Sequence, residues 1–166
     1  MSLTTARGIV FWGVTLVVFG VMNALILNKQ TVFTSGQTML LRIAPIDPRS
    51  LMQGDYMTLS YDIAMGPAAQ AIEASHADGQ IVVTLDDHNV ASFLRMHRSE
   101  PLGEGERLLR YRRRGGLRLG AESFFFQEGQ ADLYSGARYG ELKVTPAGDS
   151  VLVGLRGENF ELLGAR

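Results

Sequence analysis

Twenty consecutive residues near the N-terminus, 8–27 (GIVFWGVTLVVFGVMNALIL), carry no charged side chain. At about 1.5 Å of rise per residue, a helix of this length spans the roughly 30 Å hydrocarbon layer of a bilayer. The segment therefore predicts a transmembrane helix. The sequence at its end, NALILNKQ, offers no small-x-small cleavage site of the kind that ends a signal peptide, so we expect an uncleaved anchor.

This segment divides the chain into four parts. We expect a cytoplasmic tail at 1–7, the anchor at 8–27, a polar tether without helical periodicity at 28–37, and a single domain at 38–166. Arg7 on one side faces only Lys29 on the other, which gives a slight preference for an inside N-terminus. In a bacterium the protein would cross the inner membrane once and carry its domain in the periplasm.

Composition restricts the class of partner. The charges of the 16 basic and 17 acidic side chains nearly cancel, which argues against a nucleic-acid-binding protein. Cysteine is absent, so the chain has no disulfides, no thiolate metal sites and no cysteine nucleophile.

The part after the tether consists of short apolar or alternating runs, separated by turn residues at about the eight-to-twelve-residue spacing of all-β proteins. Tight hairpin turns are predicted at 86–89, 115–116 and 147–149, so consecutive strands should pair antiparallel. Short helices are expected at 67–76 and 130–139. The fold class is therefore mainly β: one antiparallel sheet, a sandwich or a barrel-like domain, with short helical turns. Residues 124–126, three phenylalanines, predict a strand buried on both faces, followed by a turn at Glu128.

The densest group of polar and special residues is 47–61, DPRSLMQGDYMTLSY. Asp47 and Pro48 match a helix N-cap and first-turn pair, and Gly54 matches the stop, so we expect one helical turn over 49–53. From residue 56 onward the residues alternate, which predicts a strand with Met57, Leu59, Tyr61 and Ile63 on one face and Tyr56, Thr58, Ser60 and Asp62 on the other. Arg49 and Asp55 either pair across this corner or face a ligand or partner, and pairing is favoured.

Gly54, Asp55, Tyr56, Leu59 and Tyr61 match every specified position of the GDYXXLXY family of bacterial membrane-anchored proteins. The resemblance extends to FFFQEGQA at 124–131 and to ARYGE at 137–141. It implies an anchor followed by a compact domain, no assigned biochemical activity, and a polytopic membrane protein as genomic neighbour and partner. From the joint occurrence of these motifs, the resemblance also implies that Glu128, Arg138 and Tyr139 belong to the motif surface, with Arg138 and Tyr139 reaching back to the Asp47 corner.

The residues favour a protein that is not an enzyme, and we expect no catalytic residue. A serine–lysine peptidase also carries a Gly-Asp before a strand, but it needs a lysine beside its serine. The only two lysines, Lys29 and Lys143, lie in the tether and on a distant predicted strand. Paired carboxylates at Asp86 and Asp87 belong to a turn signal.

We also expect no metal and no cofactor. The three histidines, His76, His88 and His97, match no short ligand spacing. Methionines in and around the corner suit gap-filling in a core better than a copper site. The run RLLRYRRRGGLRLG at 107–120 has six arginines and no acid. It predicts a solvated basic hairpin, with anionic lipid or an acidic partner face as the alternative.

Taken together, the sequence predicts a single-pass accessory or interaction protein whose partners are the lipid bilayer and a polytopic inner-membrane protein. The alternative is a membrane-tethered hydrolase or small-ligand-binding module that uses Asp47, Arg49, Asp55 and Tyr61. A polar pocket lined by these side chains would favour the alternative.

Overall fold

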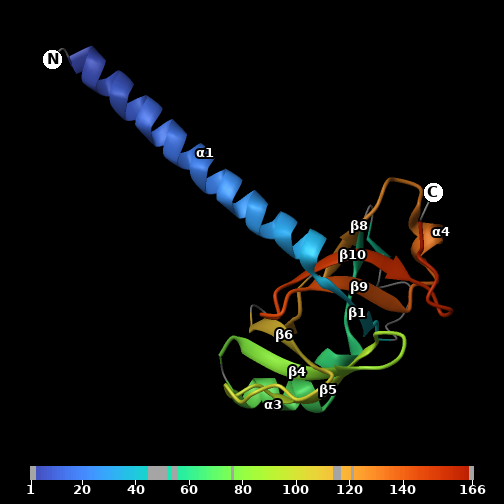
Figure 1. Ribbon diagram of the computed structural model, residues 1–166. Helices are drawn as coiled ribbons and strands as arrows, with labels where there is room; N and C mark the ends of the chain where they lie inside the picture. Colours follow the sequence, from blue (N-terminus) through green and yellow to red (C-terminus); the bar gives the residue numbers. More distant parts are fainter. Residues whose placement is uncertain are drawn as a thin grey trace.

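The computed structural model describes residues 3–44, 52–53, 56–75, 77–113, 117–120 and 122–164. A long N-terminal helix, α1 (Leu3–Ser35), projects from a strand-rich domain (Figure 1). The strands are β1 (Gln37–Arg42), β2 (Met52–Gln53), β3 (Tyr56–Thr58), β4 (Gly79–Leu85), β5 (Ala91–Met96), β6 (Glu106–Arg113), β7 (Leu117–Arg118), β8 (Ser123–Phe125), β9 (Tyr139–Val144) and β10 (Ser150–Arg156). Short helical segments are η1 (Asp62–Ala64), α3 (Pro67–Ser75) and α4 (Ala131–Tyr134).

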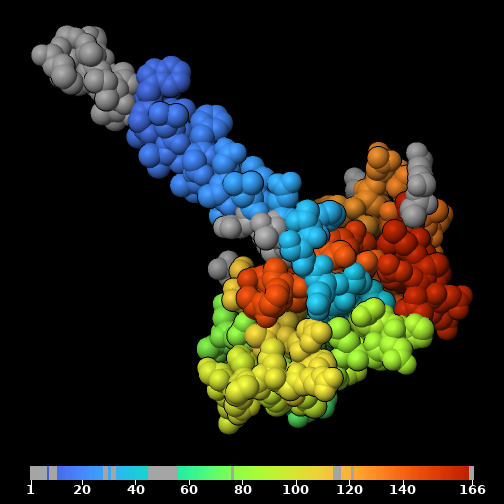
Figure 2. Space-filling view, in the orientation of Figure 1, coloured from blue at the N-terminus to red at the C-terminus, as the bar shows by residue number. Residues whose placement is uncertain are grey.

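Helix α1 is apolar on all sides rather than along one stripe. Its large apolar side chains between 11 and 27 are each 54% to 70% exposed, and the space-filling view shows this part of the helix standing clear of the domain (Figure 2). Among the described residues, no helix combines the length and the apolarity that a membrane crossing requires. The helix also continues to Ser35, so the non-helical tether predicted from residue 28 is wrong. Thr34 Oγ1 donates to the Gln30 carbonyl at 2.9 Å, which satisfies its polar group within the helix.

Within the described part of the chain, the strands form three sheets, ordered β1-β9-β10, β2-β3-β8 and β5-β4-β6-β7. Every pairing between these strands is antiparallel. A strand-rich fold with antiparallel sheets is therefore confirmed, although the strands divide among several sheets rather than forming one. Single hydrogen bonds join the sheets, such as Arg110 N to Gly148 O at 2.9 Å and Leu40 N to Asn89 O at 2.8 Å.

The larger of two hydrophobic clusters among the described residues lies between the sheets. Leu41, Ile81, Leu109, Leu142 and Leu155, from β1, β4, β6, β9 and β10, are completely inaccessible to solvent. Each such leucine or isoleucine stabilises the fold by about 1.5 to 3 kcal/mol relative to exposure. The shared core therefore holds the sheets together, although few backbone hydrogen bonds connect one sheet to another.

Two predicted hairpin turns are confirmed. Between β4 and β5, Asp86 Oδ1 accepts the backbone amides of His88 and Val90 at 2.9 and 2.8 Å, and Asn89 has a φ of 62°. Between β9 and β10, Gly148 has a φ of 81°. The third predicted turn, at 115–116, lies outside the described residues, although β6 and β7 on either side of it do pair antiparallel.

Several local predictions are wrong. Met52 and Gln53 form β2, which pairs with β3, and not the end of a helical turn. Met52 and Gln53 pair with Met57 and Tyr56, so the sequence between the two strands is Gly-Asp. This dipeptide is also a two-residue hairpin signal. The predicted strand from residue 56 ends at Thr58, and η1 follows at Asp62.

The phenylalanine run differs from its prediction as well. Phe125 is 73% exposed, whereas Phe124 and Phe126 pack against Tyr134 with ring centroids 5.0 and 5.4 Å away. Thus the run alternates and is buried on one face only. Helix α3 agrees with the predicted helix at 67–76, while the one expected at 130–139 shrinks to the single turn of α4.

Candidate functional site

The predicted corner is only partly visible. Asp47, Pro48, Arg49, Gly54 and Asp55 lie outside the described residues, so the predicted N-cap and the pairing of Arg49 with Asp55 stay predictions. The rest of the motif, from Tyr56 onward, is described.

The alternation predicted for the motif strand is confirmed by burial. Met57, Leu59 and Tyr61 are each 2% exposed, whereas Thr58 and Asp62 face solvent. Tyr56 is half-buried, and its ring lies 5.7 Å from that of the exposed Phe125 on β8. Two of the family-signature side chains, Leu59 and Tyr61, are therefore parts of the core.

Tyr61 occupies a central place in this core. Its backbone forms an isolated antiparallel bridge with Ile43, just beyond β1, and its ring lies against Gly140 of β9. Burial raises the pKa of the Tyr61 hydroxyl well above its usual range, and the nearby charge of Glu122 adds to the increase. The phenol is consequently neutral at physiological pH. Through its contacts with Ile43 and Gly140, Tyr61 connects the motif to sheet β1-β9-β10.

A hollow of about 310 Å³ opens beside the motif. We call it the motif hollow. Its lining combines residues of the motif and of the segment just after it, Thr58, Leu59, Ser60, Tyr61, Ala64 and Met65, with Leu117, Arg118 and Glu122.

A second hollow, of about 390 Å³, lies next to it, and we call it the arginine hollow. Its lining includes Arg110 and Arg112 of β6, Arg118 of β7, Ser150 at the start of β10, and Asp149 just before that strand. Arg118 and Glu122 line both hollows. The two hollows therefore meet at one ion pair, whose Arg118 Nη1 and Glu122 Oε2 lie 3.3 Å apart.

Glu122 links the motif to the arginine hairpin. Its Oε1 accepts the Leu119 amide at 3.0 Å, and its backbone carbonyl accepts the Leu59 amide at 2.7 Å. Sequence reasoning singled out the arginine run but missed Glu122. The available signal in the sequence was an acid two residues after Gly120, where the basic run ends. That glycine has a φ of 132°, and a Cβ there would collide with the Ser150 hydroxyl.

The other predicted motif residues do not line these hollows. Glu128 is exposed and precedes Gly129, whose φ of 80° fits the predicted exit turn. The Arg138 side chain is exposed, while its backbone carbonyl accepts the Ile43 amide at 2.8 Å. Tyr139 is buried with its ring 4.9 Å from Phe160, and the Arg42 guanidinium lies 5.4 Å from its centroid. The contact of Arg138 and Tyr139 with the Asp47 corner stays a prediction.

The described residues offer little catalytic chemistry. Lys143 Nζ donates to Thr38 Oγ1 at 2.9 Å, and Ser150 Oγ donates to the Leu119 carbonyl at 3.0 Å, so each has a structural partner. In the described ranges, no three histidine or acidic side chains converge as metal ligands. His88 instead stacks on Phe160 with a centroid separation of 4.4 Å.

Comparison with known proteins identifies the family of the chain. No curated protein and no solved structure matches the chain. The family model described as GDYXXLXY protein matches residues 18–155, which include part of α1, the motif and β1 to β9. Because this match covers most of the sequence, the chain belongs to the GDYXXLXY protein family.

Proposed function

We propose that this protein is a single-pass accessory protein of the bacterial inner membrane. In this proposal residues 8–27 of α1 cross the bilayer, the N-terminus stays in the cytoplasm, and the β domain lies in the periplasm. The protein acts by associating with a polytopic membrane protein rather than by catalysing a reaction.

The exposure of α1 is the single observation that carries the proposal. Phe11, Trp12, Leu16 and Phe19 are each more than 60% exposed on a helix that leaves the domain as a free rod (Figure 2). A contiguous apolar surface of this kind needs lipid or protein to cover it. The proposed span, residues 8–27 of α1, is a segment of twenty residues without a charge in the sequence.

The same helix has a face suited to another helix. A Cβ added to Gly13 or Gly20 would meet nothing within 4 Å, so the backbone is open to close approach at both positions. These glycines are seven residues apart, or about two helical turns, and Asn23 lies one turn beyond Gly20. Asn23 Nδ2 donates to the Phe19 carbonyl at 2.9 Å, while its side-chain oxygen can accept a bond from a neighbouring helix.

Membrane insertion is tested by Val17→Arg in the full chain. A charge at the centre of a membrane helix costs about 2.5 to 3.5 kcal/mol on insertion scales, so we expect loss of integral association. Val17→Leu is the matched control. Alkaline carbonate extraction of membranes is the measurement, and wild-type protein released into the soluble fraction would refute the anchor.

Partner association is tested by purification in mild detergent together with a polytopic membrane protein encoded beside this chain, the neighbour that the family resemblance implies. Gly20→Ile should reduce recovery of the partner because it blocks close helix packing. Met22→Ile, on the opposite side of α1, should retain it. A wild-type protein that is recovered alone while its neighbour is expressed would contradict the accessory role.

The second candidate is a membrane-tethered hydrolase or small-ligand-binding module. One observation favours it, namely that the motif hollow lies directly beside Leu59 and Tyr61. Met65 is exposed at the edge of this hollow, so Met65→Trp would narrow it without altering the core. A metabolite that raises the thermal unfolding midpoint of the wild type but not of this variant would establish a ligand site.

A further inference from the structure

The arginine hollow brings like charges together across a hairpin. Arg110 and Arg112 lie two residues apart on β6, so their side chains share a face, and Arg112 is the direct antiparallel partner of Arg118 on β7. Like charges opposite each other on a sheet are destabilising. An anion between them would offset this cost.

Two of the three arginines already have acidic partners. Arg110 Nη1 lies 2.9 Å from Asp149 Oδ1, and Arg118 pairs with Glu122. Arg112 is exposed and its side chain forms no ion pair with any described residue. Among its described lining residues the hollow therefore has one guanidinium in excess, in a space of about 390 Å³ that is large enough for a phosphate group.

The hollow lies at the end of the domain where α1 enters. Gln37, two residues after α1, pairs with Val144, and Val144 pairs with Ser150, which lines the hollow. Two strand spacings amount to about 10 Å, so the hollow lies close to the start of β1. If α1 crosses a bilayer, this end of the domain faces the headgroups.

We infer that the arginine hollow binds the phosphate of an anionic phospholipid headgroup, with Arg112 as the principal contact. The inference rests on the proposed membrane anchor. Guanidinium groups bind phosphate oxygens in a bidentate manner, and Asp149 and Glu122 hold the neighbouring arginines in position. The headgroup would thereby fix the orientation of the domain on the membrane surface.

The test uses the full chain in lipid nanodiscs that contain either phosphatidylglycerol or only phosphatidylcholine. Hydrogen exchange of the β6 and β7 amides is measured in both. For the wild type, we expect about fivefold slower exchange with phosphatidylglycerol, the equivalent of one basic contact near an anionic surface. Arg112→Gln should abolish most of this difference.

Arg113→Gln is the matched control, because it removes the same charge from the next residue of the same hairpin and Arg113 does not line the hollow. If both variants lose the lipid-dependent difference in exchange equally, the arginines are attracted to the membrane surface in general, and the proposed headgroup site is overturned. Equal exchange of the wild type in the two lipids would also overturn it.

Two further measurements separate the possible sources of failure. Carbonate extraction of the same samples reports the anchor independently, so a chain that is not integral refutes the proposed function. If that chain still binds phosphatidylglycerol vesicles through Arg112, the headgroup site stands. Protection of the β6 amides by soluble glycerol phosphate in detergent, without any difference between the two nanodiscs, would assign the hollow to a free phosphate and overturn the lipid source.

Discussion

Gly140 of β9 lies directly against the ring of Tyr61. A Cβ at position 140 would stand 3.0 Å from Tyr61 Cε1 and 3.2 Å from its hydroxyl oxygen. Since Tyr61 is only 2% exposed, its ring has little room to move away. The family motif at 54–61 and the ARYGE segment at 137–141 therefore meet through this contact.

Gly140→Ala should destabilise the domain by about 1 to 3 kcal/mol, because an added methyl group overpacks a filled core. Denaturant unfolding of the full chain in detergent measures the change. Gly136→Ala is the control, since a Cβ there meets nothing within 4 Å. Equal stability of the two variants would contradict the contact.

Tyr61 should make folding stability dependent on alkaline pH. Its folded pKa is raised by burial, so the stabilisation is fully present below about pH 10, where the unfolded tyrosine is also protonated. Above that pH the unfolded state releases a proton that the folded state retains. Stability should then fall by up to about 1.4 kcal/mol per pH unit, until the folded pKa is reached.

Tyr61→Phe removes this group and should flatten the alkaline decline. The measurement is the free energy of unfolding of both proteins between neutral and strongly alkaline pH. Parallel curves for the wild type and the variant would show that Tyr61 ionises freely in the fold.

Glu141 and Arg156 form a partly buried pair in which Glu141 Oε2 lies 2.8 Å from Arg156 Nε. The Glu141 side chain is 11% exposed and that of Arg156 is 29% exposed. Arg156→Gln should cost about 3 kcal/mol or more because it leaves the more buried carboxylate unpaired. Glu141→Gln should reduce stability less, because the Arg156 guanidinium stays in contact with solvent and retains its 2.6 Å hydrogen bond to the Phe160 carbonyl. The reverse order in unfolding experiments would contradict this assignment.

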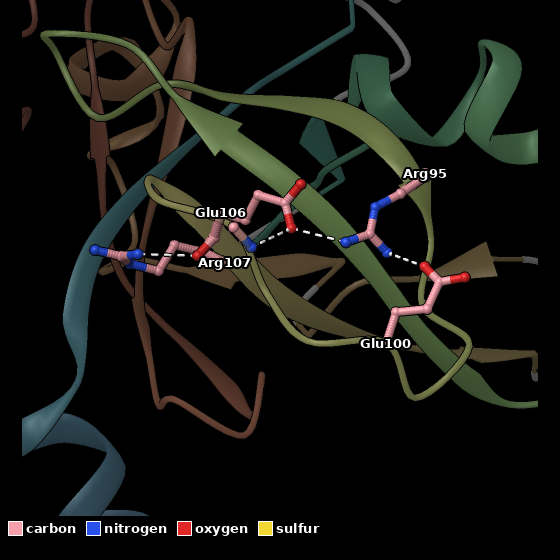
Figure 3. Close-up of polar contacts among 5 residues, drawn as sticks. Arg95, Glu100, Glu106 and Arg107 are labelled. Atoms are coloured by element: carbon pink, nitrogen blue, oxygen red, sulfur yellow. Dashed lines mark hydrogen bonds and ion pairs between the residues drawn. The ribbon is translucent and has the colours of Figure 1, made fainter.

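Arg95 bridges two acids of unequal burial. Its Nη1 and Nη2 each lie 2.8 Å from one carboxylate, of Glu100 and Glu106 respectively (Figure 3). Glu106 is 15% exposed and also accepts the Gly103 amide at 2.9 Å, whereas Glu100 is 56% exposed. We therefore expect Glu106→Gln to lower the thermal midpoint clearly and Glu100→Gln to change it little, because exposed ion pairs contribute about 0 to 1 kcal/mol. A larger effect at Glu100 would refute this ranking.

Local signals predicted the parts of the fold that local physics controls. The Asp86 turn and the Gly148 turn follow from side-chain capping and positive φ, and α3 follows from its alanine-rich composition. The alternation of Met57, Leu59 and Tyr61 identified the buried face of the motif. These features need no knowledge of distant residues.

The remaining features depend on contacts that are remote in sequence. Phe125 looked buried because three phenylalanines stand together, yet only Phe124 and Phe126 pack on the ring of Tyr134, whereas Phe125 stays exposed beside Tyr56. Glu122 could not be recognised as the residue shared by two hollows before β7 and the motif strand were placed together. The competing hairpin and helix signals around Gly54 likewise could not be ranked without the partner strand β8, which pairs with β3.

The passage from α1 to β1 has a mechanical consequence. Only Gly36 separates Ser35, the last helical residue, from Gln37, the first strand residue. One residue spans at most about 3.6 Å, so the connection has almost no slack. A displacement of the end of α1 must therefore carry the start of β1 with it, which couples the position of the rod to the strand that leads into the interior.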